Sequence, residues 1–181
     1  ALCSCATPLS SSRSPEILRF ERAALEDSRA HLTRGDISAA VAALGRALEE
    51  SQALQAATLI RSPALLVEHG HLLYLQGDHH QASEACTGAL GVAESYDVTV
   101  LAKAWVCIGK ANLKTNSTLA AHSFEEGFTA FREAQASNDS DMEVTEESLS
   151  LQGGLTMEDP ALSETEILAH WGAALVLVGN T

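Results

Sequence analysis

Histidines are the side chains of this chain that could most readily bind a metal. Four of the seven lie close together in the sequence, as His69, His71, His79 and His80. His69 and His71 are two residues apart on an expected helix, so their side chains diverge. His79 or His80 can approach His71 across a turn, which provides two ligands, whereas zinc takes three or four. We therefore expect surface histidines and no metal site.

Motifs for nucleophilic catalysis or phosphate binding are missing from the sequence. It contains no Gly-x-Ser-x-Gly elbow, no Walker-type loop and no G-x-G-x-x-G. The adjacent acidic pairs at 49–50 and 125–126 lie on expected helices, where neighbouring side chains diverge instead of converging on a substrate. We expect no enzymatic activity, no catalytic residues and no cofactor.

Four cysteines are too few for a disulfide framework in a chain of 181 residues. Cys3 and Cys5 form an isolated C-x-C motif. Cys86 and Cys107 lie on helix faces that we expect to be buried, where cysteine acts as a small apolar core residue. This pattern favours a reducing intracellular compartment such as the cytoplasm.

Charge is distributed unevenly along the chain, which has a net charge of −13. All 11 basic residues lie at or before Arg132, whereas ten of the 24 acids follow it. Nucleic-acid binding needs clustered Lys and Arg, so we expect no nucleic-acid partner. The longest strongly apolar run, Ala173–Val178, is too short to span a bilayer, and we expect no membrane insertion.

The elements that position these side chains repeat along the sequence. Ala and Leu dominate and aromatic residues are scarce, which favours helices. A Gly followed by Asp lies between two apolar stripes of helical period at 35–36 and again at 77–78. After each pair, matching positions carry small or apolar residues at a shift of 42: Ala40, Leu44, Ala47 and Leu48 in the first unit, Ala82, Cys86, Ala89 and Leu90 in the second.

Helix-start signals precede these pairs, and two further units follow. Ser-Pro begins a helix at 14–15 and at 62–63. In a third unit Trp105, Ile108 and Gly109 mark the first helix, and Ser117 is the expected cap of the second. Residues 163–166 form a capping box that begins a fourth helix.

These units resemble the tetratricopeptide repeat. Seven residues of the second unit follow that family's pattern in order: Leu66, Gly70, Gly77, Asp78, Ala82, Cys86 and Ala89. The first unit matches with Ser28, Gly35, Asp36, Ala40, Leu44 and Ala47. The units are longer than the usual period of about 34 residues, have few aromatics and lack the closing proline. The resemblance implies an all-α, right-handed superhelix of antiparallel helical hairpins that acts as a protein-binding scaffold.

The expected organisation has four parts. An N-terminal segment covers residues 1–14, three hairpins cover 15–136, an acidic flexible insertion covers 137–162, and the first helix of an incomplete fourth repeat covers 163–181. The insertion has no basic residue, so it is either a solvated loop or a tethered acidic arm for a basic partner.

The resemblance implies a concave groove lined by the first helix of each unit, where some members of the family hold carboxylates with Lys and Asn. Arg22 and Arg29 of the first unit, with Lys103 and Lys110 of the third, are the corresponding partner-binding candidates. The second unit has no Lys or Asn at the matching positions, so this clamp is incomplete. Ordinary solvated charge is the alternative interpretation of these four side chains.

Two functions from different classes follow. The first is an adaptor or scaffold that binds a partner peptide or helix in the groove. The second is a constitutive structural subunit of a larger multiprotein assembly, held through its edges and its final helix.

Overall fold

The chain forms α-helices throughout the part that a computed structural model describes, residues 15–54, 62–93, 98–141 and 163–179. The expectation of an all-α fold is confirmed for these residues. None of the described helices is both long and apolar enough to cross a membrane. In chain order the helices are α1 (Pro15–Thr33), α2 (Ile37–Leu54), α3 (Pro63–Gln76), α4 (His79–Ala93), α5 (Val98–Asn112), α6 (Ser117–Asp141) and α7 (Glu164–Gly179).

The two Gly-Asp pairs connect the helices of the first and second hairpins, as predicted. Gly35 and Gly77 have φ angles of 78° and 95°, a left-handed conformation that glycine adopts without steric penalty. The carboxylates of Asp36 and Asp78 then accept hydrogen bonds from backbone N–H groups three residues later, at 2.9 and 3.0 Å. Such a cap stabilises a helix by about 1 kcal/mol.

Serine caps begin α3 and α7 at the predicted residues. The hydroxyl of Ser62 accepts a hydrogen bond from the backbone N–H of Leu65 at 3.3 Å, and Pro63 occupies the first turn. The hydroxyl of Ser163 accepts from the backbone N–H of Glu166 at 3.2 Å. The side chain of Glu166 contacts Lys110 of α5.

The third hairpin differs from the prediction at both ends of α6. Asn116, not Ser117, caps the helix, since its side-chain oxygen accepts from the backbone N–H of Leu119 at 3.0 Å. The helix runs to Asp141, five residues into the segment predicted to be a flexible insertion. The rest of that insertion, residues 142–162, and the predicted N-terminal segment 1–14 lie outside the described residues.

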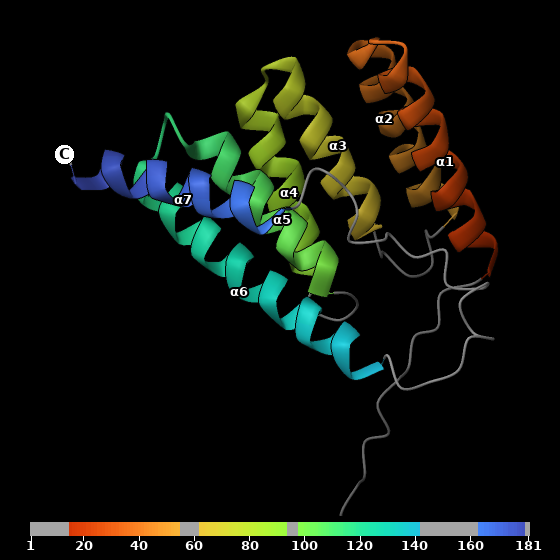
Figure 1. The fold of residues 1–181 in the computed structure, drawn as a ribbon. Helices are drawn as coiled ribbons and strands as arrows, with labels where there is room; N and C mark the ends of the chain where they lie inside the picture. Colours follow the sequence, from red (N-terminus) through yellow and green to blue (C-terminus); the bar gives the residue numbers. More distant parts are fainter. Residues whose placement is uncertain (1–14, 55–61, 94–97, 142–162, 180–181) are drawn as a thin grey trace, which may run out of the picture.

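The helices pack as hairpins stacked in chain order (Figure 1). Within the hairpins, α1 packs on α2, α3 on α4 and α5 on α6, while α7 packs on α6 and touches α5. Each second helix also packs on the first helix of the next hairpin, α2 on α3 and α4 on α5. In addition, the first helices contact one another in succession, α1 with α3 and α3 with α5.

The positions matched at a shift of 42 lie in the core. Ala40, Leu44, Ala82 and Ala89 are fully buried, and Cys86 is fully buried beside them. The apolar stripe of α1 is buried less than its sequence suggests, because α1 lies at one end of the stack (Figure 1). The buried residues of α1 are Glu21 and Ser28, while its apolar side chains Phe20, Leu25 and Leu32 are partly buried.

Candidate partner-binding face

The first helices of the three hairpins share one surface, which carries a depression open to solvent. The empty space over the depression, about 250 Å³, includes open solvent. Its apolar walls come from α1, α3 and α5, and two charged residues complete it. The lining residues are Leu25, Ala64, Val67, Glu68, Val100 and Lys103. We call this surface, together with Arg22 and Arg29, the first-helix face.

One of the four predicted anchor residues, Lys103, lines the depression from α5 and is half-buried. Arg22 and Arg29 are exposed on α1, three residues before and four residues after Leu25. Residues at these spacings lie on the same side of a helix, one turn apart. Arg22 and Arg29 therefore share one side of α1 with Leu25, while Lys103 lines the depression from α5.

Lys110 does not belong to this face, which corrects the expected position of its ammonium group. Its side chain is only 7% exposed, and its Nζ donates a hydrogen bond to Glu166 Oε1 at 2.6 Å. Because α7 packs against α5 at this point, the carboxylate of Glu166 neutralises the ammonium of Lys110, for which the sequence indicated no partner. A charge-assisted hydrogen bond of this kind is short and strong. Lys110 thus belongs to the attachment of α7.

His170 completes a polar cluster with that ion pair. Its Nε2 lies 3.8 Å from Glu166 Oε1, and its ring stacks on Phe124 with centroids 5.7 Å apart. Burial lowers the pKa of His170, and the positive charge of Lys110 lowers it further, while Glu166 acts in the opposite direction. Glu166 and His170 are four residues apart on α7, a spacing at which side chains of a helix meet, but nothing in the sequence indicated that Lys110 of α5 would join them.

Of the other histidines, His69 and His79 have different surroundings. His69 is partly buried on α3, and desolvation lowers its pKa. The ring of His79 packs against Tyr74 with centroids 5.4 Å apart, and its Nδ1 is buried without a hydrogen-bond partner. Among the described residues, no group of three His, Cys, Asp or Glu side chains is placed to hold a metal ion.

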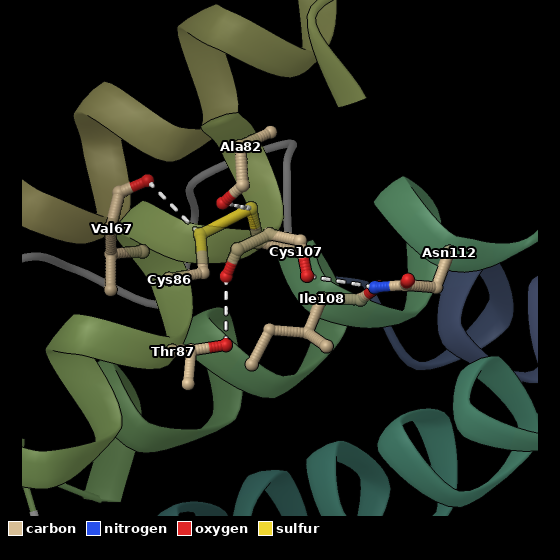
Figure 2. Close-up of a disulfide and its surroundings, with 8 residues drawn as sticks. Val67, Ala82, Cys86, Thr87, Cys107, Ile108 and Asn112 are labelled. Carbon is tan, nitrogen blue, oxygen red and sulfur yellow. Dashed lines mark hydrogen bonds between the residues drawn. A yellow bond between two sulfur atoms is a disulfide. The ribbon is translucent and has the colours of Figure 1, made fainter. Parts of the chain in front are cut away.

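A disulfide joins Cys86 of α4 to Cys107 of α5 (Figure 2). Both residues are buried, as the sequence predicted, but their pairing was not foreseen. It connects the second hairpin to the third. Gly70 of α3 makes room for it, because a Cβ atom there would collide with the sulfur of Cys86. A spatial pairing of this kind has no sequence signal, since the two positions are 21 residues apart and belong to different repeats.

Comparison with known proteins adds no assignment: no protein-family model matches the chain, and no curated protein matches it.

Proposed function

We propose that this chain is a non-catalytic protein-interaction module of the tetratricopeptide-repeat type, a right-handed superhelix that binds a partner peptide or helix on the first-helix face. The observation that carries the proposal is the depression formed jointly by α1, α3 and α5. Helical stacks expose such continuous surfaces because each unit contacts only its neighbours.

The lining of the depression suits an apolar side chain of a protein partner. The depression is open to solvent, and Leu25, Ala64 and Val67 are among its lining residues. Its apolar walls match one anchoring side chain. Arg22 and Arg29 would then contact carboxylates beside that anchor. The preferred partner is therefore an apolar residue with acidic neighbours, held in a helix or an extended segment.

The direct test is a selection of peptides on the purified chain from a random display library, followed by measurement of Kd. We expect Ala64→Trp, which fills the depression, and the pair Arg22→Glu with Arg29→Glu each to weaken binding by about tenfold or more. Arg46→Glu is the matched control, because Arg46 is exposed on α2. Selected peptides that bind all of these variants equally would refute binding at the first-helix face.

One observation favours the second candidate function, a structural subunit of a larger assembly. Beyond His170, α7 has no charged residue and exposes large apolar side chains. A helix that is apolar on all sides is normally covered. The exposed apolar residues of α7 are Leu168, Leu175, Val176 and Leu177.

The two functions predict different outcomes when the chain is isolated from a native extract. A permanent subunit is favoured if the double variant Leu175→Gln with Leu168→Gln retains no co-purified proteins while Ala64→Trp retains all of them. The opposite result would favour an adaptor that binds through the first-helix face. Deletion of residues 142–162 tests whether the acidic segment contributes to retention of the co-purified proteins.

A further inference from the structure

The joint between the second and third hairpins contains two sulfur atoms that are both removed from solvent. Cys86 is 0% exposed and Cys107 is 5% exposed. Their Cα atoms lie 6.4 Å apart, within the range of about 4.4–6.8 Å in which a disulfide forms without movement of the backbone. The bond therefore fits the spacing at which α4 packs on α5.

Each sulfur also lies near a backbone carbonyl oxygen. The sulfur of Cys86 lies 4.0 Å from the carbonyl oxygen of Val67, and that of Cys107 lies 4.0 Å from the carbonyl oxygen of Ala82 (Figure 2). In the reduced chain each S–H can donate a weak hydrogen bond to one of these acceptors. Each thiol therefore has a carbonyl acceptor near the position that its sulfur has in the disulfide.

From these observations we propose that Cys86 and Cys107 form a reversible redox lock between the second and third hairpins. With the bond formed, α4 and α5 cannot separate. With the thiols reduced, packing alone holds the joint, and it opens more often. Val67 and Val100, from the two hairpins, line the depression, so the lock also limits movement across the first-helix face. The inference does not depend on what that face binds.

The bond forms by thiol–disulfide exchange, in which a low-molecular-weight disulfide such as oxidised glutathione is the oxidant. The thiolate of Cys107, the more exposed of the two, attacks one glutathione sulfur and releases one glutathione thiolate. The thiolate of Cys86 then attacks the sulfur of Cys107 and releases the second. The two protons lost by the cysteines are taken up by the two glutathione thiolates. Both attacks need a transient opening between α4 and α5, because the packed joint excludes the reagent.

The experiment uses the full chain with Cys3→Ser and Cys5→Ser, so that only this pair of cysteines reacts. After reduction, oxidised glutathione is added, and alkylation under denaturing conditions followed by mass measurement counts the free thiols. We expect the two thiols to disappear without a retained glutathione adduct. The melting temperature of the oxidised chain should be higher by about 6–12 °C, the effect of closing a loop of this length. Hydrogen exchange in α4 and α5 should slow in parallel.

Controls separate the lock from a generic effect of oxidant. Adding Cys86→Ala and Cys107→Ala to the same chain should remove the shift in melting temperature. Circular dichroism of the reduced chain should retain its helical signal. Loss of helix on reduction would overturn reversibility, and the bond would be a requirement for folding. Persistent glutathione adducts or free thiols would overturn the pairing of Cys86 with Cys107. A disulfide that forms but leaves hydrogen exchange in α4 and α5 unchanged would overturn the lock.

Discussion

The third hairpin is joined to its two neighbours by different physical means. Towards the second hairpin, the contact between α4 and α5 contains a buried disulfide with backbone carbonyls around its sulfurs, and one side-chain hydrogen bond from Asn112 to Ser83. Towards α7, an ion pair and aromatic contacts add to the buried apolar residues Ile167 and Ala174. Lys110 pairs with Glu166, His170 stacks on Phe124, and the rings of Phe128 and Trp171 lie 6.1 Å apart.

This difference determines which conditions loosen each joint. A joint of sulfur, small residues and aliphatic groups responds to reductant and to changes in side-chain volume, because its packing is dense. A joint that depends on an ion pair and a histidine responds to pH and to loss of a charge partner. The stack therefore contains one rigid boundary and one adjustable boundary on either side of the same hairpin. The predictions below test that contrast.

The largest effect is expected from Gly70→Ala at the rigid joint. The added Cβ would collide with the sulfur of Cys86 and lie 3.1 Å from the carbonyl oxygen of Ala82. Overpacking of this kind costs about 1–3 kcal/mol, and we expect a value near the upper end in the oxidised chain. In the reduced chain the sulfur can rotate away, so the loss should be smaller. Urea unfolding of both oxidation states measures the difference.

A matched substitution on the neighbouring helix serves as the control. Gly88 lies in α4, and a Cβ atom there would meet no atom within 4 Å. Gly88→Ala should raise the free energy of unfolding by about 0.5–1 kcal/mol, because alanine favours a helix more than glycine does. Equal losses for Gly70→Ala in the two oxidation states would show that the collision is not with a bonded sulfur.

At the adjustable joint, the two members of the ion pair should differ in their effects. Lys110 is 7% exposed, and Glu166 is 35% exposed. Glu166→Gln leaves a buried ammonium without a counter-charge and should lower the free energy of unfolding by about 2 kcal/mol. Lys110→Met replaces the cation by an apolar chain of similar length, and the partly exposed carboxylate of Glu166 can then bind water instead. We expect a loss of about 1 kcal/mol or less for this variant.

The exposed pair of Arg132 and Glu164 is the control for this prediction. Arg132 Nη1 lies 3.6 Å from Glu164 Oε1, and the side chains are 60% and 41% exposed. Arg132→Gln should change the free energy of unfolding by less than about 0.5 kcal/mol. A greater loss for Lys110→Met than for Glu166→Gln in urea unfolding would contradict the order derived from burial.

The helices and their turns were predictable because local sequence specifies them. Gly35 and Gly77 have the predicted left-handed conformation, and Ser62 and Ser163 cap the predicted helices. The buried face of the second hairpin followed from periodicity. The cap at Asn116 was misassigned by one residue, because Asn and Ser both cap well and adjacent candidates compete.

Contacts between units could not be read from the sequence. The pairing of Cys86 with Cys107 depends on how α4 rests on α5, and the pairing of Lys110 with Glu166 depends on how α7 docks. Periodicity tells which side of a helix is buried but not which residue of another helix covers it. For this reason Lys110 was expected on an open groove, although Arg22 and Arg29 are exposed as expected.

The smallest effect is expected from the protonation of His170. Its pKa is lowered in the folded chain by burial and by Lys110, against the opposing effect of Glu166. As the pH falls through the ordinary histidine pKa of 6.5, the unfolded chain binds a proton before the folded chain does. The free energy of unfolding should therefore decline as the pH falls below that value, and the decline ends below the lowered pKa, where both states are protonated.

Fluorescence of Trp171 can measure this effect at α7 itself. The chain has two tryptophans, so Trp105→Phe leaves Trp171 as the single reporter, beside Phe128. Unfolding curves at about pH 7.5 and pH 5.5 bracket the ordinary pKa of histidine. His170→Phe retains an aromatic ring against Phe124 and should reduce the change in the free energy of unfolding between these pH values. His69→Gln, in the second hairpin, is the control and should leave the contribution of His170 to this change intact. An unchanged pH dependence in His170→Phe would mean that another group, not this histidine, makes the α7 joint sensitive to acid.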